Sequence, residues 1–339
     1  MKNNFSTTYP GISNQSFDIH EGGNMKRSFR AVLLEALNRN AENYPNLVVL
    51  NADSARALSL TKFTAAYPDR MFGMGISEAD MLSTAAGMAA TGLIPIVVGF
   101  SMFVSEKPFE QIRQSIAYPN LNVKIIATHS GLCVGQDGAT HQALEDIAIM
   151  RMLPNFKVFV SADVTETKSI IDAMMKYDGP AYLRLGRDMA EDIYLEDKIS
   201  VPGGADVLLD GKDVTIAACG LMVEPALQAA RALKEEGISA AVLNVYSIKP
   251  LNDKLLLEYA SKTNAMVTAE DHMKAGGLGG AVAELIGQDH PVPVRRVGVN
   301  DHFGESGSQE ELYLKYGLTA ERIMEEARIA ISAKRQVGR

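Results

Sequence analysis

Two carboxylates stand close together in the stretch Gly73–Gly87, GMGISEADMLSTAAG, where Glu78 and Asp80 open an alanine-rich segment. Ser77 followed three residues later by Asp80 predicts a capping box, and so a helix that begins near residue 77. The helix dipole also favours acids in a first turn, which gives Glu78 an ordinary structural interpretation. The cap does not require Glu78, however, because Ser77 and Asp80 already supply both partners. Glu78 is therefore also a candidate for proton chemistry.

A second group of candidates follows the short apolar runs that we expect to be strands. In an open parallel sheet, ligands gather at the carboxyl ends of the strands, so residues just past these ends are candidates for a binding site. Acidic, basic and imidazole side chains on one rim would suit a polar, anionic substrate. The residues in question are Asp53, Phe100, Phe103, His129 and Arg187, together with Asp137 and His141 in the polar loop from 135 to 141.

Each of these residues also has a structural interpretation. Aromatic side chains beside a strand usually pack against a helix, and His129 and His141 could be hydrogen-bonded structural histidines. Arg187 could form a surface ion pair with Asp188 or Glu191, which contributes little. The histidines and acids do not follow a recognised ligand spacing, so we expect no metal ligands in this chain. The sequence also lacks G-x-S-x-G, H-E-x-x-H and G-x-x-x-x-G-K-[ST], which disfavours the chemistries of those motifs.

Alternating strands and helices must position these residues. Near-continuous apolar runs alternate with longer helical patterns, as in parallel sheets that are covered on both faces. A stretch rich in Asp, Glu, Pro and Gly at 188–205 separates two such series and predicts a boundary close to residue 195. The sequence thus predicts an α/β fold with two tandem domains and mostly parallel sheets. The expected strands are 47–53, 94–100, 123–129, 156–161 and 181–185, then 214–219, 240–245, 265–269 and 292–297.

Composition narrows the class of protein. A chain of 339 residues with 47% hydrophobic residues can bury two cores. Its net charge of -8, without basic runs, argues against nucleic acid or an anionic membrane as partner. Cys133 and Cys219 form no C-x-x-C pair, which fits a reducing, cytoplasmic location. Residues 1–24 lack an apolar core and predict an extended N-terminal arm rather than a signal peptide, and no later segment is long enough to span a membrane.

Several linked motifs resemble the pyrimidine-binding domain of transketolases, which are thiamine-diphosphate enzymes. The motifs match in both order and spacing, and the similarity continues into the second half of the chain, which resembles the transketolase C-terminal domain. The resemblance implies a pyrimidine-binding domain at 25–190 and a C-terminal domain at 203–335. The motifs are Arg70–Glu78, Gly99–Phe103, Ala127–His129, Gly135–Gln142 and Asp178–Arg187.

One expected part is missing from this sequence. Transketolases also carry a diphosphate-binding domain with a Gly-Asp-Gly motif that helps to hold the metal, and this chain contains no Gly-Asp-Gly. The resemblance therefore implies the C-terminal subunit of a split transketolase, inactive alone. An N-terminal subunit would supply the ligands for the diphosphate and Mg²⁺, in an α2β2 assembly. The implied reaction moves a two-carbon ketol unit from a ketose to an aldose, and the ketose would be phosphorylated, sulfonated or branched.

The resemblance also implies roles for the candidate residues. Glu78 would hydrogen-bond N1′ of the cofactor's aminopyrimidine, Phe100 would stack on that ring, and Phe103 would line its pocket. Asp53 would lie near the cofactor at a subunit contact. The substrate positions are Arg27, His129 and Arg187 for a terminal phosphate, Asp137 for a hydroxyl next to the reacting carbon, and His141, also a catalytic candidate, for the donor's C1 hydroxyl and carbonyl.

Some positions depart from the family pattern. Gln136 and Ala139 replace an acid and a proline in the loop, and Ser130 stands where an aspartate often follows the histidine. Ala57 stands where a phosphate-contacting serine is common, and no aromatic residue follows Phe103 within Ser105–Lys107. These changes leave the cofactor interpretation intact and leave the identity of the sugar open.

Three other interpretations remain. A β subunit of a 2-oxoacid dehydrogenase E1 is disfavoured by His129 and the Asp-Gly-Ala-Thr-His sequence at 137–141. A one-chain protein like deoxyxylulose-phosphate synthase would need the diphosphate domain that is missing. A non-catalytic assembly subunit would have no need to retain Glu78 and both loop histidines.

Overall fold

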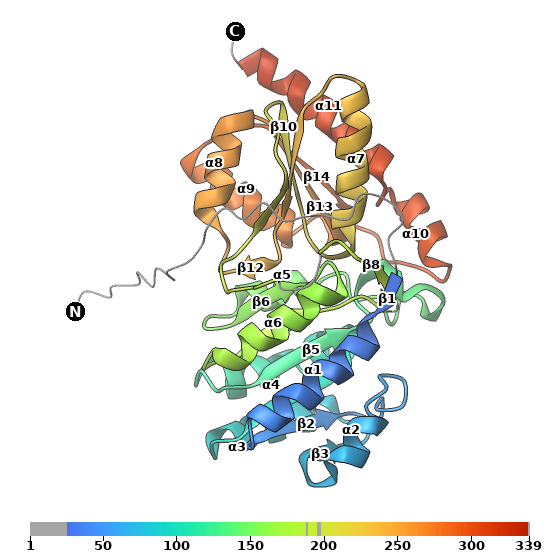
Figure 1. Ribbon diagram of the computed structural model, residues 1–339, viewed down its shortest axis with the longest axis vertical. Coiled ribbons are helices and arrows are strands. Elements are labelled where there is room, and N and C mark those ends of the chain that lie inside the picture. Colours follow the sequence, from blue (N-terminus) through green and yellow to red (C-terminus); the bar gives the residue numbers. More distant parts are fainter. Residues whose placement is uncertain (1–25, 188, 195–197, 338–339) are drawn as a thin grey trace, which may run out of the picture.

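Two stacked units of strands and helices make up the chain (Figure 1). The computed structural model describes residues 26–187, 189–194 and 198–337, and the N-terminal arm expected at 1–24 lies outside the described residues. One unit contains a seven-stranded sheet and the other a five-stranded sheet, and most neighbouring strands are parallel. The predicted α/β fold with two tandem, mostly parallel domains is therefore confirmed.

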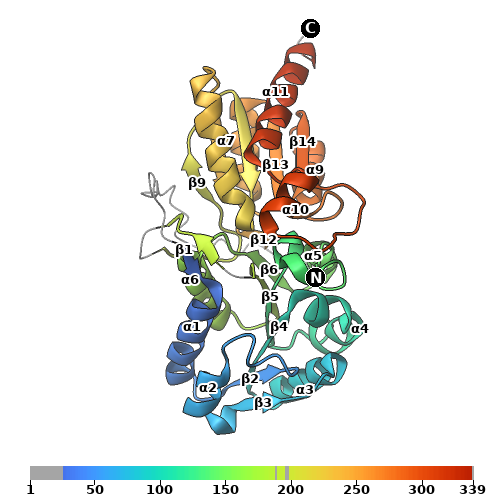
Figure 2. The ribbon, with the colours of Figure 1, turned by 90° about the vertical axis from the view of Figure 1, so that its right-hand side faces the viewer.

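The first sheet has the strand order β12-β6-β7-β5-β4-β2-β3. Both faces of this sheet are buried. Leu47 and Val49 of β2 pack with α1 and α6 on one face, whereas Val48 and Leu50 pack with α3 on the other. Figure 2 shows α1 and α6 on one side of this sheet and α3 and α4 on the other. The bounds are β2 Leu47–Asn51, β3 Met71–Gly73, β4 Ile94–Phe100, β5 Lys124–Thr128, β6 Lys157–Val160, β7 Ala181–Arg184, α1 Phe29–Asn43, α2 Thr61–Ala66, α3 Glu78–Ala90, α4 Phe109–Gln111, α5 Asp146–Met152 and α6 Val164–Lys176.

The second sheet has the order β14-β13-β10-β11-β9, in which only β9 runs antiparallel to its neighbour. Helices α7 and α11 cover one face, and α8 and α9 cover the other. No helix in the described part of the chain combines the length and apolarity needed to cross a membrane. The bounds are β9 Asp206–Leu209, β10 Val214–Ala218, β11 Ala240–Asn244, β13 Met266–Met273, β14 Val294–Val299, α7 Val223–Glu235, α8 Asp253–Thr263, α9 Leu278–Asp289, α10 Gln309–Tyr316 and α11 Ala320–Val337.

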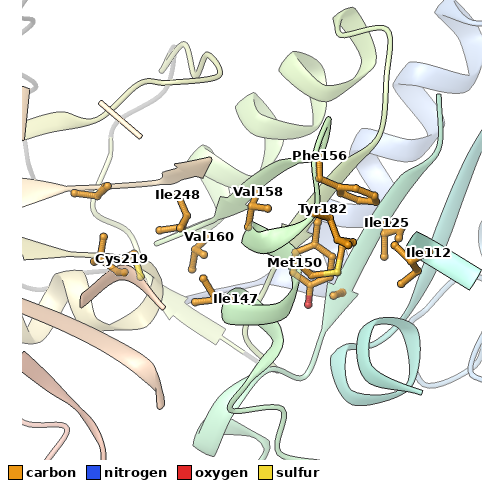
Figure 3. Close-up of a cluster of buried hydrophobic side chains, with 14 of the residues drawn as sticks. Ile112, Ile125, Ile147, Met150, Phe156, Val158, Val160, Tyr182, Cys219 and Ile248 are labelled. Atoms are coloured by element: carbon orange, nitrogen blue, oxygen red, sulfur yellow. The ribbon is translucent and has the colours of Figure 1, made fainter. Parts of the chain in front are cut away.

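The two units share a continuous apolar core. Strand β12 (Ser247–Lys249) belongs to the second half of the sequence but pairs antiparallel with β6 at the edge of the first sheet. Figure 3 shows Ile248 of β12 beside Val160 and Ile147 of the first unit, with Cys219 of the second unit nearby. A shared core of this kind fixes the position of one domain on the other, because separating them would expose apolar surface to water.

Short elements complete the description. A two-stranded antiparallel ribbon joins β1 (Lys26–Ser28) and β8 (Met189–Glu191). Met102–Glu106 (η2) and Ile112–Ala117 (η3) are π-helical turns. The 3₁₀ turns are Pro68–Arg70 (η1), Gly131–Asp137 (η4, interrupted at Gly135) and Gly220–Met222 (η5).

The capping box predicted at Ser77 is wrong. Helix α3 begins at Glu78 as expected, but the Ser77 side chain makes no capping hydrogen bond. The backbone N–H of Ser77 donates to Gly75 O at 2.9 Å, so it does not need the reciprocal bond that Asp80 would provide. A complete capping box forms instead between Ser308 and Glu311 at the start of α10.

A buried histidine at the domain junction should make stability depend on pH. Burial lowers the pKa of His272 to about 4, and the Asp146 carboxylate opposes this only in part. The neutral ring suits its surroundings, because Nε2 accepts from Ala148 N at 3.3 Å and Nδ1 lies 2.7 Å from Met273 O. The folded state thus binds this proton more weakly than the unfolded state. The contribution of His272 to the free energy of unfolding should therefore be fully present above about pH 6.5 and should fall by roughly 3 kcal/mol toward about pH 4.

Urea unfolding of the isolated chain at several pH values measures this dependence. We expect His272→Gln to reduce the loss of stability between about pH 6.5 and about pH 4.5, because its amide does not titrate. The matched control is His302→Gln at an exposed position, which should follow the parent protein. Equal pH slopes in the parent and His272→Gln would contradict the prediction.

Candidate active site

A cavity of about 180 Å³ opens at the carboxyl ends of β2 and β4. Glu78, the first residue of α3, lines it, and this carboxylate is buried with 4% of the residue exposed. Cavities of about 150 Å³ hold a benzene-sized ring, so this one can admit a single heterocycle. The remaining lining residues are Ala52, Asp53, Ser54, Ile76, Gly99, Phe100, Phe103 and Val104.

Lys107 compensates the buried charge of Glu78. Its Nζ lies 2.6 Å from Glu78 Oε2, and the lysine side chain itself is half exposed. A buried carboxylate is costly unless a cation or hydrogen bonds offset its desolvation. Sequence reasoning had not predicted this contact, because no local pattern relates positions 29 residues apart.

Removing this cation should destabilise the chain. We expect Lys107→Met to lower the free energy of unfolding by about 1–3 kcal/mol, since it leaves the Glu78 carboxylate buried without its partner. Adding Glu78→Gln to Lys107→Met should restore part of the loss, as a double-mutant cycle in urea would measure. Lys168→Met is the control, because its pair with Glu35 is exposed and should contribute at most about 1 kcal/mol. A Lys107→Met chain as stable as Lys168→Met would contradict this account.

Two phenylalanines border the cavity. Phe100 ends β4 and Phe103 lies in the π-turn η2, and their ring centroids are 6.3 Å apart with a tilt of 30°. The turn packs tightly on the strand, since a Cβ on Gly99 would lie 2.4 Å from Val104 Cγ1. Glycine at 99 thus allows the close approach that places both rings beside the same cavity.

The same rings link the cavity to both candidate histidines. The Phe100 and His129 ring centroids are 4.1 Å apart, and Phe103 meets His141 edge-on at 5.1 Å. His129 follows β5 in a left-handed conformation with φ of 55°, and Thr128 Oγ1 lies 3.0 Å from its Nδ1. The structure therefore brings His129 and His141 to the predicted site from two different segments.

Asp53 borders the cavity from the end of β2. Asn51 holds this turn, because its Nδ2 donates to Val98 O at 2.7 Å and its Oδ1 accepts from Ser54 N at 2.8 Å. The Asp53 backbone is left-handed with φ of 58°, a conformation that aspartate adopts more readily than most residues. The turn thus places Asp53 in the same lining as Glu78.

Asp137 and Arg187 form an ion pair in the polar loop. Arg187 Nη1 lies 3.3 Å from Asp137 Oδ2 and also donates to Val134 O. Both side chains are partly exposed, so the pair contributes little to stability. These two candidates therefore lie together, as the strand-end rule predicted.

The structure does not bring Arg27 to this cluster. Arg27 lies in β1, where its Nε contacts Asp192 Oδ1 at 2.7 Å and its Nη2 donates to Thr165 Oγ1 at 2.6 Å. It lines a different cavity, formed by α1, α6 and residues 198–202. Its predicted contact with a substrate phosphate therefore has no support in the geometry of this chain.

A buried ion pair beneath the site had not been predicted. Asp146 accepts hydrogen bonds from Ser101 at 2.9 Å, from Tyr182 at 2.7 Å and from Arg184 Nε at 2.9 Å. Although burial raises the pKa of Asp146, the Arg184 guanidinium and the hydrogen bonds from Tyr182 and Arg184 hold that pKa below its usual range. Ser101 directly follows Phe100, so the network anchors the end of β4. In the sequence, Arg184 stands within the otherwise apolar run Ala181–Leu185, and an arginine in a buried strand indicates a buried acidic partner.

Comparisons with known proteins agree with this arrangement. The family model for the transketolase pyrimidine-binding domain matches residues 25–191, and the model for the transketolase C-terminal domain matches residues 203–323. The fold and the two matches thus assign this chain to the class of proteins in which a pyrimidine-binding domain is followed by a transketolase C-terminal domain. The chain belongs to the transketolase family, whose members bind thiamine diphosphate.

Several relatives correspond to this chain over nearly their full length. A chain of Methanocaldococcus jannaschii, provisionally named a transketolase C-terminal section, is 43% identical over 309 residues, which cover 89% of this chain and 96% of the relative. The 6-deoxy-6-sulfo-D-fructose transketolase subunit SqwH of a Clostridium species is 40% identical over 315 residues, covering 93% and 97%. A solved structure, described as a split-gene transketolase in an inactive β4 tetramer, is 45% identical with a TM-score of 0.85, and 91% of this chain covers 99% of it.

Proposed function

We propose that this chain is the C-terminal subunit of a heteromeric transketolase that transfers a two-carbon ketol unit from a ketose to an aldose. The observation that carries the proposal is the cavity of about 180 Å³ lined together by Glu78, Phe100 and Phe103. A buried acid beside flat aromatic faces suits an aminopyrimidine, which offers ring nitrogens to the acid and a π-face to the rings.

The residues of the cavity fit one end of thiamine diphosphate. Once bound, the cofactor would supply the electron sink for cleaving and forming the carbon–carbon bond. Glu78 would bind N1′ of the pyrimidine and hold a proton there, while Phe100 and Phe103 would orient the ring and exclude water. Asp53 would close the cavity from the end of β2.

The polar side chains beyond Phe100 and Phe103 would bind the sugar. His141 would contact the C1 hydroxyl and carbonyl of the donor, and Asp137 a hydroxyl next to the reacting carbon. His129 and Arg187 would bind a terminal anion, for which a guanidinium is well suited. Phosphate and sulfonate are both tetrahedral anions, and related chains are named for a sulfonated sugar and for apulose 4-phosphate. The donor class we propose is therefore a ketose with an anionic end group, including sulfonated and branched forms.

A second polypeptide would complete the site. This chain has no Gly-Asp-Gly sequence, so we infer that an N-terminal subunit binds the diphosphate and Mg²⁺. We propose two copies of each subunit, in the cytoplasm, where the thiols of the two buried cysteines stay reduced. A one-chain protein like deoxyxylulose-phosphate synthase fits less well, since this chain spans only about half the length of such relatives.

Reconstitution tests the proposal. The chain is purified alone and together with the N-terminal transketolase subunit encoded nearest to it, with thiamine diphosphate and Mg²⁺ present. Phosphorylated, sulfonated and branched ketoses are then screened as donors against a set of aldoses. We expect ketol transfer only from the two-subunit mixture. Equal transfer by the isolated chain, or none by the mixture with every donor, would overturn the proposal.

A further inference from the structure

A carboxylate of the second domain reaches into the loop that carries Asp137 and His141. Asp271 lies in β13 and is buried, with 4% of the residue exposed. Its Oδ1 accepts a hydrogen bond from Leu132 N at 2.9 Å, and its Oδ2 accepts one from Cys133 N at 3.3 Å. Both donors belong to η4, the first part of this loop.

The loop is shaped to receive this carboxylate. Gly131 has a φ of 76°, and a Cβ at that position would lie 2.3 Å from Asp271 Oδ2. Position 131 therefore requires glycine for two reasons: its backbone is left-handed, and Asp271 occupies the space that a Cβ would need. The start of the loop and the end of β13 therefore pack closely together and are joined by hydrogen bonds.

Asp271 is itself held from both domains. Tyr313 of α10 donates from its hydroxyl to Oδ2 at 2.9 Å, and Arg184 of β7 donates to the backbone oxygen of Asp271 at 2.8 Å. Figure 2 shows α10 at the end of the second domain that meets the first. The side chain thus has a fixed position from which to bind the loop.

The second domain also contacts the later part of the loop. Gln142 Nε2 donates to Glu305 O at 2.9 Å, and a Cβ on Gly138 would lie 2.6 Å from Ser306 Oγ. The second domain therefore contacts the loop at its start, at Gly138 and at Gln142, so Asp137 and His141 each lie between two of these contacts. A displacement of the loop at its start would therefore alter the position of Asp137, and through the loop that of His141.

We propose that Asp271 is a positioning residue, through which the C-terminal domain sets the location of Asp137 and His141 for the donor sugar. This role rests on the proposed function of the site. Asp271 does not line the cavity of Glu78, and the groups that its carboxylate binds belong to the loop and to α10. A shift of about 1 Å in a substrate-positioning group can cost about 10²-fold in rate.

The test uses Asp271→Asn and Tyr313→Phe in the two-subunit enzyme. Asparagine keeps the shape but turns one acceptor into a donor that faces an N–H or O–H, and phenylalanine removes only the hydroxyl. The matched controls are Asp210→Asn and Tyr259→Phe, which alter another tyrosine–aspartate hydrogen bond of the second domain, 3.0 Å long.

We expect kcat/KM for the donor to fall about 10–100-fold in Asp271→Asn, and less in Tyr313→Phe, while the affinity for thiamine diphosphate stays within about twofold. Hydrogen exchange of the Leu132 and Cys133 amides should accelerate in both variants and not in the controls. Parent-like donor kinetics, or an equal loss of donor kinetics and cofactor affinity, would overturn the positioning role. Absence of ketol transfer in the parent complex would instead overturn the proposed function, and this role with it.

Discussion

Replacement of Glu78 by glutamine should reduce ketol transfer by the two-subunit enzyme by about 10²–10⁴-fold, the usual contribution of a positioned acid or base. Glutamine preserves the size of the side chain and one hydrogen-bonding oxygen, but it cannot take up and hold a proton at N1′. The structure makes the change specific, because Glu78 is the one carboxylate at the start of α3 that is buried within the cavity lining, whereas Asp80 is not part of that lining. Initial rates with saturating donor and cofactor measure the effect.

Two controls separate chemistry from binding and folding. Asp80→Gln alters the neighbouring acid of the same helical turn and should keep the parent rate within about threefold, as expected for a surface substitution. Titration with thiamine diphosphate should show a smaller change for Glu78→Gln than the change in kcat. If Glu78→Gln turns over as fast as the parent, the cavity does not act on the cofactor and the proposed mechanism is wrong.

The strands of both sheets were predictable because most of them are long and buried on both faces. Strand β4 was predicted at 94–100 and occupies Ile94–Phe100, since its residues bury both faces and the run has clear ends. Strand β12 could not be predicted in the same way. It has three residues, and its pairing with β6 joins segments about 90 residues apart, which no local periodicity records. Strand β3 was missed for the same reason of length, whereas the edge strand β9 alternates buried and half-buried residues and so lacks a continuous apolar run.

The candidate site was predictable to the extent that it lies at strand ends. Phe100 ends β4, His129 directly follows β5 and Asp53 lies two residues past β2, so the rule for parallel sheets placed them on one rim. Lys107 lies outside the reach of that rule. Asp271 lies just past the expected strand 265–269, but the rule does not relate it to a loop of the other domain. Lys107 meets Glu78 through a π-turn, and Asp271 meets the loop from another domain. Contacts of this kind depend on tertiary packing, which the sequence pattern does not encode.

Breaking the buried ion pair of Arg184 and Asp146 should lower the free energy of unfolding more than breaking the other ion pairs discussed above. Arg184→Met leaves the Asp146 carboxylate fully buried with its charge uncompensated, and such changes cost about 3–5 kcal/mol. Arg184 also donates to Ala143 O at 3.1 Å and to Asp271 O at 2.8 Å, so its loss loosens the contact between the two domains. Urea unfolding of the isolated chain, followed by circular dichroism, measures the free energy of unfolding.

The size of the effect should depend on the charge left behind rather than on the loss of an arginine as such. Arg39→Met is the matched control, since its pair with Asp172 is partly exposed and should contribute about 0.2–1 kcal/mol. Adding Asp146→Leu to Arg184→Met should recover part of the lost stability, because the orphaned charge is then removed. If the double variant is no more stable than Arg184→Met, or if Arg184→Met costs no more than Arg39→Met, the pair is not the anchor beneath the site, and the end of β4 must be held by packing alone.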